Sequence, residues 1–128
     1  MKTPLLVSVV DDDESVRESL PDLIRELGFE ARAFESAEAF LHSGYIAQTD
    51  CLILDLMMPG MGGQELALEL RGRGIGIPII FITANHSHGA RLKMLNNEAI
   101  TCLYKPFSDV DLSEALISAV QNMGGKHP

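Results

Sequence analysis

The sequence predicts an α/β fold in which helices cover both faces of one five-stranded parallel sheet. Three observations support this prediction. Five short segments rich in apolar and β-branched residues recur along the chain, segments with helical spacing separate them, and three of the five are almost continuously apolar. Continuous apolar strands are typical of parallel sheets that are buried on both sides. With right-handed crossovers, the common arrangement at this size is a doubly wound (βα)5 sheet of strand order 2-1-3-4-5.

The first predicted strand is Leu5–Val10, an apolar run that ends at three aspartates. A helix follows, because apolar residues recur at intervals of three or four as far as Gly28, which is a good stop signal. These residues are Val16, Leu20, Leu23, Ile24 and Leu27. Pro21 lies within the pattern and removes one backbone donor, so we expect a bend there and not a break.

The next two strands and their helices follow the same alternation. The second strand is Glu30–Phe34, and Ser36 after it is suited to cap a short helix over Ala37–His42. The third strand is Cys51–Leu54. The leucines of Gln64–Arg71 indicate its helix, which ends at a glycine.

The last two units complete the predicted fold. Ile77–Thr83 is the fourth strand, and Leu92 and Leu95 mark a short fourth helix. The fifth strand is Ile100–Tyr104, and Ser108-Asp109 cap a fifth helix. The apolar residues of that helix are Leu112, Leu116, Ile117 and Val120.

Length and composition limit the classes of function. With 128 residues, 46% of them hydrophobic and 22% charged, the chain suits a single domain, with a core over about residues 4–122 and a flexible tail over 123–128. No apolar run could span a bilayer and no signal peptide is recognisable, so we expect a cytoplasmic protein that does not contact membranes. Cys51 and Cys102 lie in apolar runs, as free thiols do in a reducing compartment. A net charge of −8 without a basic stripe argues against direct binding of nucleic acid.

Polar side chains stand at the carboxyl ends of four predicted strands. In a doubly wound sheet these ends meet at one edge, where ligands bind near the switch point between the first and third strands. The residues are Asp11, Asp12 and Asp13 after the first strand, Asp55 after the third, Thr83 at the end of the fourth and Lys105 after the fifth. Each has a structural explanation too, since acids favour helix N-termini, threonine is common in strands and lysine in loops. Their coincidence at one edge favours a functional site.

The carboxylates of Asp11, Asp12 and Asp55 would repel one another at this edge. Two like charges at ~4 Å cost about 4 kcal/mol at an effective dielectric constant of 20. A divalent cation, pairing with Lys105, or retention of a proton by one acid could each compensate. Because all the ligands are oxygens, Mg²⁺ or Mn²⁺ fits better than Zn²⁺, and the backbone carbonyl of Met57 could complete the metal shell.

Asp55 is the best-placed nucleophile, because it stands alone at the end of its strand. A carboxylate can accept a phosphoryl group, and that reaction needs mainly positioning and neutralisation of charge. Lys105 could supply a positive charge to the phosphoryl oxygens and Thr83 a hydroxyl donor. The glycines of Gly60–Gly63 fit tight packing at the following turn better than a phosphate cradle, since no GK[ST] motif follows them.

Taken together, these motifs resemble the CheY-like receiver domains of two-component response regulators, of the type often joined to helix-turn-helix output domains. The resemblance extends over about residues 4–122. The matching segments are Val9–Asp13, Leu54–Gly63, Ile82–Ala84 and Tyr104–Phe107.

The resemblance implies a flavodoxin-like fold and a signalling switch. A histidine kinase would phosphorylate Asp55 with Mg²⁺ held by Asp11, Asp12, Asp55 and the Met57 carbonyl. Affinity for a downstream output domain or protein, or for a second copy of the chain, would then change at the face made by the fourth helix, fifth strand and fifth helix. The chain would catalyse only its own phosphorylation and dephosphorylation. The resemblance also implies that Thr83 and Lys105 respond to the phosphoryl group and that the Lys105-Pro106 bond is cis.

Two departures from the family leave an alternative open. Cys102 occupies the position of a usual Phe or Tyr switch residue, although Tyr104 shares its face of the strand. The loop Asn85–His88 replaces a more usual Gly-Asp. Both would suit a pseudo-receiver, a binding module that is never phosphorylated. A phosphatase with an aspartyl nucleophile is a third reading, but the chain is too short for a substrate cap. The kinase, the pathway, the oligomeric state and any further domain remain open.

Overall fold

The computed structural model describes residues 4–84 and 101–125, the last four of them by their backbone alone. Five parallel strands form one sheet in the order β2-β1-β3-β4-β5, which confirms the predicted fold class and strand order. The strands are β1 Leu6–Val10, β2 Glu30–Phe34, β3 Cys51–Asp55, β4 Ile79–Thr83 and β5 Thr101–Tyr104.

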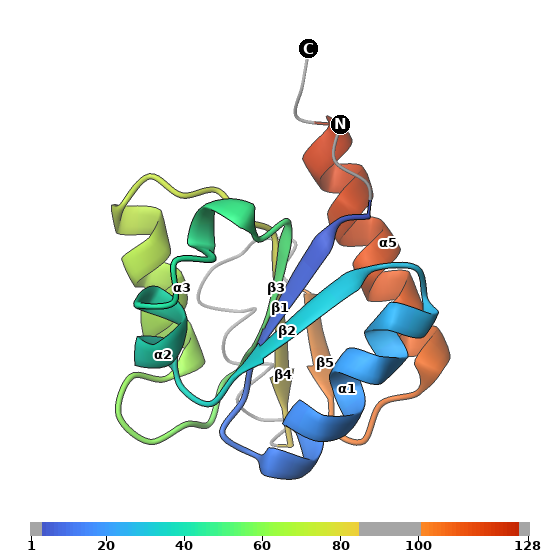
Figure 1. Ribbon diagram of the computed structural model, residues 1–128, viewed down its shortest axis with the longest axis horizontal. Helices are drawn as coiled ribbons and strands as arrows, with labels where there is room; N and C mark the ends of the chain where they lie inside the picture. The colour runs from blue at the N-terminus through green and yellow to red at the C-terminus, as the bar shows by residue number, and fades with distance from the viewer. Residues whose placement is uncertain (1–3, 85–100, 126–128) are drawn as a thin grey trace.

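Helices cover both faces of this sheet. Figure 1 shows α1 and α5 on one side of the strands and α2 and α3 on the other. The helices are α1 Glu14–Glu26, α2 Ala37–Leu41, the 3-10 turn η1 Ile46–Gln48, α3 Gly63–Gly72 and α5 Asp109–Gly125. The predicted fourth helix and the loop Asn85–His88 lie outside the described residues. Residues 123–125, expected in a flexible tail, continue α5.

Helix α1 runs through Pro21 without a break, as expected. Its N-cap is Asp13, whose carboxylate accepts the Ser15 N–H at 2.9 Å. Pro21 is itself buried, together with Leu20 and Ile24. Because this face of the helix packs on the sheet, burial offsets the backbone hydrogen bond that the proline removes.

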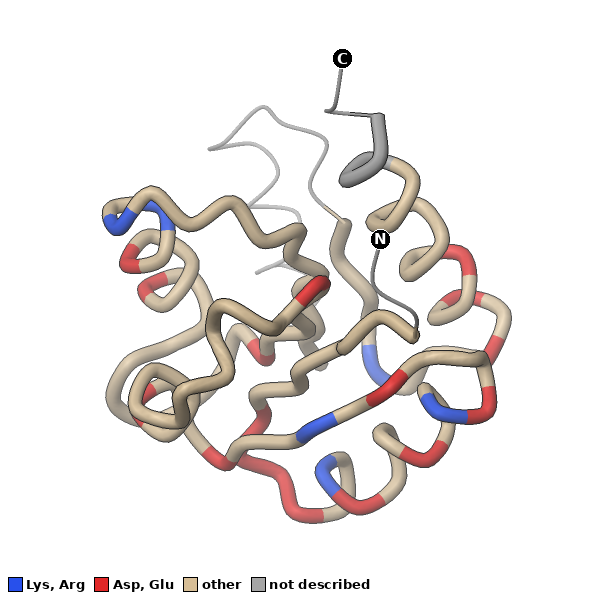
Figure 2. Tube along the Cα trace, turned by 45° about the horizontal axis from the view of Figure 1, so that its top comes forward, with Lys and Arg blue, Asp and Glu red and all other residues tan. Residues whose placement is uncertain are grey.

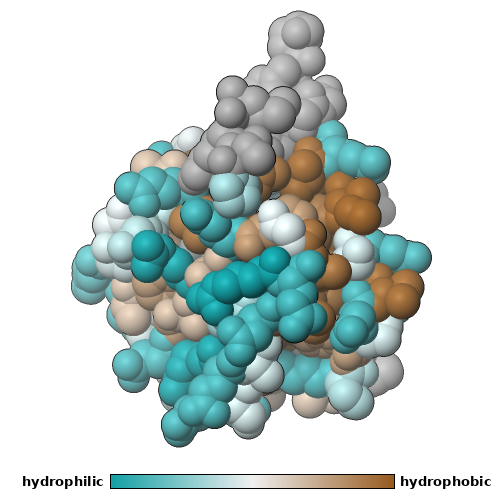
Figure 3. Space-filling model, turned by 45° about the vertical axis from the view of Figure 1, so that its right-hand side comes forward, coloured by the Kyte–Doolittle hydropathy of each residue, from teal (hydrophilic) through white to brown (hydrophobic). Residues whose placement is uncertain are grey.

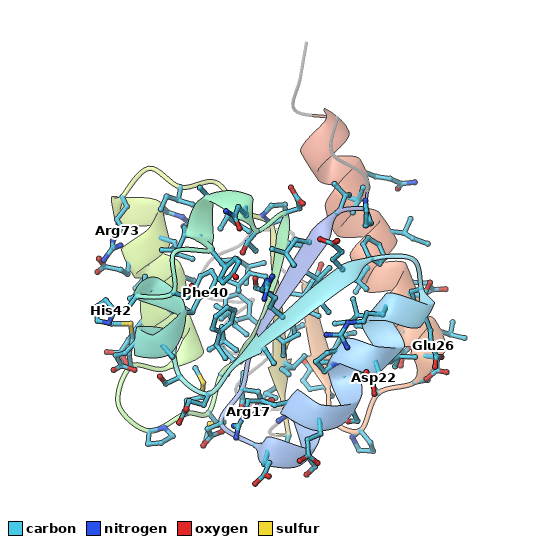
Figure 4. All side chains as sticks on the ribbon, in the orientation of Figure 1. Arg17, Asp22, Glu26, Phe40, His42 and Arg73 are labelled. Carbon is cyan, nitrogen blue, oxygen red and sulfur yellow. The ribbon has the colours of Figure 1, made fainter. Side chains whose placement is uncertain are left out.

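The core is split in two by the sheet, because successive strand residues point to opposite faces. Val7 and Val9 of β1 pack under α1 and α5, whereas Val10 packs under α2 and α3. On the second side Phe40 is fully buried between α2 and the sheet (Figure 4), edge-on to Phe34 with ring centroids 5.3 Å apart. Every residue of β1 and β3 is buried, which explains why both strands are apolar except at Ser8 and Asp55.

Three strand boundaries differ from the prediction among the described residues. Strand β1 begins at Leu6, one residue later than expected. Strand β4 begins at Ile79, two residues later than expected, and Pro78 before it accepts a hydrogen bond from the Leu52 N–H. Proline has no N–H to return, so regular pairing starts only after it. Strand β3 is one residue longer than expected and includes Asp55, which pairs in register with Ile82. The strand therefore delivers the Asp55 side chain directly to the carboxyl edge of the sheet.

At the amino-terminal edge, hydrogen bonds tie β1 to the segment that precedes β3. The Asp50 carboxylate accepts the main-chain N–H of Leu6 at 2.8 Å. The buried hydroxyls of Ser8 and Thr49 are 2.7 Å apart, and Thr49 also donates to the Tyr45 carbonyl at 2.8 Å. The polar side chains of Asp50, Ser8 and Thr49 thus make hydrogen bonds to other groups of the protein.

Two further expectations concern the cysteines and membranes. Cys51 and Cys102 are buried and form no disulfide, and burial raises the pKa of the Cys51 thiol to about 12. Among the described residues, no helix combines the length and apolar character that crossing a membrane requires.

Candidate functional site

Three aspartates meet at the carboxyl edge of the sheet. Asp11 and Asp12 follow β1, and Asp55 ends the neighbouring strand β3. One carboxylate oxygen from each lies within 4.8 Å of one from the others. We call these three residues the acid cluster. Figure 2 shows the acidic residues that follow β1 in red, along the turn into α1 at the bottom of the view.

Asp11 is fully buried and held on several sides. Its main-chain N–H donates to the Phe34 carbonyl at 3.1 Å, which extends the pairing of β1 with β2 by one residue. Its carboxylate accepts the Asp13 N–H at 2.9 Å on Oδ1 and the Lys105 ammonium at 3.0 Å on Oδ2. The side chain is therefore fixed in orientation, and both carboxylate oxygens have a donor.

Asp55 is 4% exposed and less completely bonded. Its Oδ1 accepts the Met57 N–H at 3.1 Å, and its Oδ2 lies 3.7 Å from the Lys105 ammonium. Burial disfavours the charged carboxylate and raises the pKa of Asp55 to about 7, with the nearby Asp11 carboxylate acting in the same direction. The Met57 hydrogen bond and Lys105 oppose this shift without cancelling it.

Lys105 reaches the acid cluster from the end of β5. Its main-chain N–H donates to the Thr83 carbonyl at 2.8 Å, and its bond to Pro106 is cis, as the resemblance implied. Burial alone would lower the pKa of Lys105. The hydrogen bond and charge of Asp11, together with the charge of Asp55, outweigh burial and raise this pKa above its ordinary value, so the ammonium stays protonated. One ammonium group thus contacts two acids of the cluster.

Thr83 and Tyr104 stand opposite each other in the pairing of β4 with β5. Thr83 is fully buried and ends β4 at the same edge as Asp55. Cys102 and Tyr104 pack on one side of the sheet and Leu103 on the other, which is the alternation expected from the sequence. Tyr104, and not Cys102, is therefore the β5 residue level with Thr83.

The remaining acid of the Asp11–Asp13 run has a structural role. Asp13 accepts hydrogen bonds from the Ser15 hydroxyl and main-chain N–H, which lower its pKa, and it caps α1. Asp12 is exposed. Met57, whose carbonyl is a candidate metal ligand, is 49% exposed at the start of the loop after β3.

Gly63 packs directly against the backbone of Asp55. A Cβ atom at Gly63 would lie 2.5 Å from the main-chain oxygen of Asp55, closer than a side chain can approach. The expectation that glycines allow tight packing at this turn is met at this position. The first turn of α3 consequently lies against the end of β3.

One contact at this edge was not expected from the sequence. Arg17 of α1 donates from Nη1 to the main-chain carbonyl of Asp11 at 3.0 Å. A basic residue six positions after Asp11 was a weak signal, because charged residues are common on an exposed helix face.

The chemistry of the acid cluster fits a hard divalent cation. Three carboxylates with one lysine leave an excess of negative charge, and all the candidate donors are oxygens. Mg²⁺ and Mn²⁺ prefer such ligands. The raised pKa of Asp55 shows that its charged form is poorly compensated by the protein alone.

Comparison with known proteins agrees with these features. A family described as response regulator receiver domain matches residues 7–117. Nodulation protein W of Bradyrhizobium diazoefficiens is 40% identical over 119 residues, which are 93% of this chain and 52% of that protein. The transcriptional regulatory protein FixJ of Rhizobium meliloti is 35% identical over 121 residues, or 94% of this chain and 59% of that protein. This chain thus spans a little over half the length of these curated relatives.

Solved structures of response regulators are also similar to this chain. The response regulator StyR superposes with a TM-score of 0.83 at 41% identity, over 94% of this chain and 61% of that one. The structure of FixJ-N superposes with a TM-score of 0.79 at 34% identity, over 94% of this chain and 96% of that one.

Proposed function

This chain belongs to the response regulator receiver domain family, and we propose that it is a signalling switch in which Asp55 accepts a phosphoryl group from a histidine kinase. One observation carries the proposal. The carboxylate of Asp55 stands at the carboxyl edge of the sheet with two further acids within 4.8 Å and a lysine 3.7 Å away. An acceptor, a candidate cation site and a fixed positive charge therefore share one position.

Among the three acids, the hydrogen bonds favour Asp55 as the acceptor. Both oxygens of Asp11 are engaged, one by the Asp13 N–H and one by Lys105. Asp12 is exposed, so it is less well positioned. The Oδ2 of Asp55 is 3.7 Å from the Lys105 ammonium, which is beyond hydrogen-bond distance. This oxygen is therefore the one available to attack a phosphorus atom.

In the proposed transfer, Asp55 Oδ2 attacks the phosphorus of a phosphohistidine. The new O–P bond forms while the N–P bond breaks. The electron pair of the N–P bond stays on the imidazole, and a proton from water leaves that ring neutral. Lys105 would shift its ammonium from Asp11 toward the phosphoryl oxygens, and the Thr83 hydroxyl would donate to one of them.

The acid cluster would hold Mg²⁺, or Mn²⁺, through Asp11, Asp12 and Asp55, with the main-chain carbonyl of Met57 as a further ligand. When bound, the ion would offset negative charge on the transferred group. The hydrogen bonds from Asp13 and Lys105 hold Asp11 toward the cluster before any ion arrives.

Phosphorylation would change binding at the face that includes β5 and α5. Helix α5 exposes Val110 at 63% and Ile117 at 50%. Figure 3 brings the side of α1 and α5 forward and shows hydrophobic surface beside hydrophilic surface there. We propose that a downstream output domain or protein, or a second copy of the chain, binds this face, and that Tyr104 couples it to Thr83.

The same proposal extends to the chain as a whole. We infer that residues 1–128 form one receiver domain with no activity beyond its own phosphorylation and dephosphorylation. It would act in the cytoplasm, as two cysteines without a disulfide suggest, and would not itself bind nucleic acid. The fourth helix, which the resemblance places in the output face, lies outside the described residues.

Intact mass after incubation with MgCl2 and acetyl phosphate tests the acceptor. We expect one added phosphoryl group on the wild-type chain and none on Asp55→Asn. Asp50→Asn, the same change at the other end of β3, is the matched control and should be phosphorylated like the wild type.

Two outcomes would count against the switch. Phosphorylation of Asp55→Asn would place the acceptor elsewhere. A folded wild-type chain that takes up no phosphate and shows no response to Mg²⁺ would favour the pseudo-receiver. The presence of Cys102 where related domains usually have Phe or Tyr also suits that alternative.

A further inference from the structure

Arg17 connects α1 to the backbone of the acid cluster. Its guanidinium donates to the main-chain carbonyl of Asp11 at 3.0 Å, and its own main-chain N–H donates to the Asp13 carbonyl at 3.1 Å. Figure 4 shows Arg17 beside the turn that joins β1 to α1. The side chain is half-buried, so this hydrogen bond is only partly open to water.

The Asp11 carbonyl needs such a donor because the β1–β2 ladder stops there. The last ladder bond runs from the Asp11 N–H to the Phe34 carbonyl. In a parallel ladder the next bond to Asp11 would come from a main-chain N–H two residues beyond Phe34. At that point β2 has ended, and Ser36 is already the cap of α2. The guanidinium of Arg17 takes the place of the missing strand donor.

With this bond, every polar group of Asp11 has a partner. The N–H is held by Phe34, Oδ1 by Asp13 and Oδ2 by Lys105. In the proposed transfer Lys105 turns toward the phosphoryl group, and Asp11 then loses one of these partners. The bond from Arg17 is the charged contact to Asp11 that this movement leaves intact.

We propose that Arg17 is a positioning residue, which holds the backbone of Asp11 so that its carboxylate faces the divalent cation. This inference rests on the proposed cation site and adds a residue to it. Arg17 touches neither the ion nor the phosphoryl group in this account. It acts through Asp11.

The direction in which Mg²⁺ affinity changes when Arg17 is removed distinguishes a positioning role from an effect of its charge alone. Removing a positive charge near the acid cluster would, by electrostatics, make Mg²⁺ bind more tightly. Removing a positioning contact would make it bind more weakly. Loss of a group that orients a metal ligand commonly weakens metal binding by about 10- to 100-fold. Arg17 contacts the main chain and not the ligand atom, so we expect an effect at or below the lower end of that range, about five- to tenfold.

Arg25 provides a matched control on the same helix. It also donates from its guanidinium to a main-chain carbonyl six residues away, that of Ala31, at 3.1 Å. Arg25→Ala therefore removes the same charge and the same kind of bond from α1, together with an exposed ion pair to Asp22 at 2.9 Å, at the end of the helix away from the acid cluster. It lies in the last turn of the helix, whereas Arg17 lies in the first.

The test is a titration of the full 128-residue chain with MgCl2 in the absence of phosphodonor, followed by the amide NMR signals of Asp11 to Asp13. We expect Arg17→Ala to raise the Kd for Mg²⁺ about five- to tenfold and Arg25→Ala to change it less than twofold. Arg17→Lys, which keeps the charge and a donor group on a shorter side chain, should fall between Arg17→Ala and the wild type. If Arg17→Ala does not fold, Arg17→Gln replaces it.

Three results would overturn the inference. Unchanged or tighter Mg²⁺ binding by Arg17→Ala would mean that Arg17 does not position Asp11. Equal weakening by Arg17→Ala and Arg25→Ala would point to a general effect on α1. A wild-type chain that does not bind Mg²⁺ at all would remove the proposed function as well, which distinguishes that failure from the other two.

Discussion

Strand β3 carries an aspartate at each end, Asp50 just before it and Asp55 as its last residue. Asp50 accepts a hydrogen bond from Leu6, and beside it the hydroxyls of Ser8 and Thr49 bond to each other. Asp55 instead lies next to two more acids, and burial, reinforced by the Asp11 charge, raises its pKa to about 7. At the amino-terminal edge the protein bonds its own polar groups, whereas at the carboxyl edge it leaves negative charge for a ligand to compensate.

This difference separates stability from function along one strand. The polar groups before β3 tie this strand to β1 through hydrogen bonds within the protein. These bonds do not depend on a ligand. The acid cluster is destabilising without a cation, because like charges are held together by the strands that carry them. The contrast predicts that removing a carboxylate has opposite effects on stability at the two edges.

The largest expected effect is at the carboxyl edge, in Gly63→Ala. Its Cβ would meet the Asp55 main-chain oxygen at 2.5 Å, so α3 or the end of β3 must shift. We expect a loss of about 3 kcal/mol in the free energy of unfolding, together with weaker Mg²⁺ binding, because overpacking costs ~1–3 kcal/mol or more. Urea unfolding measures the first quantity.

Gly72→Ala is the control for that change. It lies at the other end of α3, and a Cβ there meets no atom within 4 Å. Its stability should equal or slightly exceed that of the wild type. If both alanine variants unfold at the same urea concentration as the wild type, the close packing of α3 on Asp55 is not essential.

Asp50→Ala comes next and tests the amino-terminal edge. It leaves the N–H of the buried Leu6 without its side-chain acceptor. We expect a loss of about 2 kcal/mol in the free energy of unfolding, since an unsatisfied buried donor costs ~1–3 kcal/mol. Asp50→Asn keeps an acceptor oxygen and should lose less. Equal stability of Asp50→Ala and the wild type would show that this edge is not held by the bond.

Asp55→Asn should have a smaller effect of the opposite sign. In the absence of Mg²⁺ at pH 8 it should be more stable than the wild type by roughly 1–2 kcal/mol, because one pKa unit corresponds to about 1.4 kcal/mol and Lys105 offsets part of the cost of the buried charge. Thermal unfolding with and without MgCl2 measures this. A lower Tm for Asp55→Asn than for the wild type at pH 8 would contradict the expectation that the charged Asp55 carboxylate destabilises the folded protein.

The pH dependence of this difference follows from the raised pKa of Asp55. Above about pH 7 the carboxylate is charged in the folded and unfolded chains, so the folded protein carries the whole penalty. As the pH falls from about 7 toward the ordinary value of 3.8, the folded chain takes up the proton first and the penalty is relieved. The advantage of Asp55→Asn should therefore shrink over that window.

The sequence predicted the carboxyl edge because the alternation of strands and helices follows from periodicity, and it predicted the strand order because that order is the common arrangement at this size. Continuous apolar strands alternating with helical segments leave few topologies, and a parallel sheet brings the ends of β1 and β3 together. Asp11, Asp12 and Asp55 could therefore be placed near one another without coordinates. The start of β4 was less predictable, because Ile77 is apolar but the following Pro78 lacks an N–H.

Contacts that depend on side-chain direction could not be predicted. Apolar periodicity does not distinguish Asp12 from Asp13, which the resemblance alone separated, and the geometry shows that Asp13 caps α1. The bond from Arg17 to the Asp11 carbonyl requires knowing where β2 stops, a boundary that pattern reading leaves uncertain by a few residues. The 3-10 turn η1 has no clear periodicity and was not predicted.

The most direct test of the account locates the phosphoryl group on the chain. Borohydride reduces an acyl phosphate to an alcohol, so a phosphorylated aspartate becomes homoserine, which peptide mass spectrometry can place. After incubation with MgCl2 and acetyl phosphate, we expect homoserine at position 55, in the wild type and in Asp50→Asn alike. Homoserine at position 11 or 12, or none in a folded chain that binds Mg²⁺, would contradict the assignment of Asp55 as the acceptor.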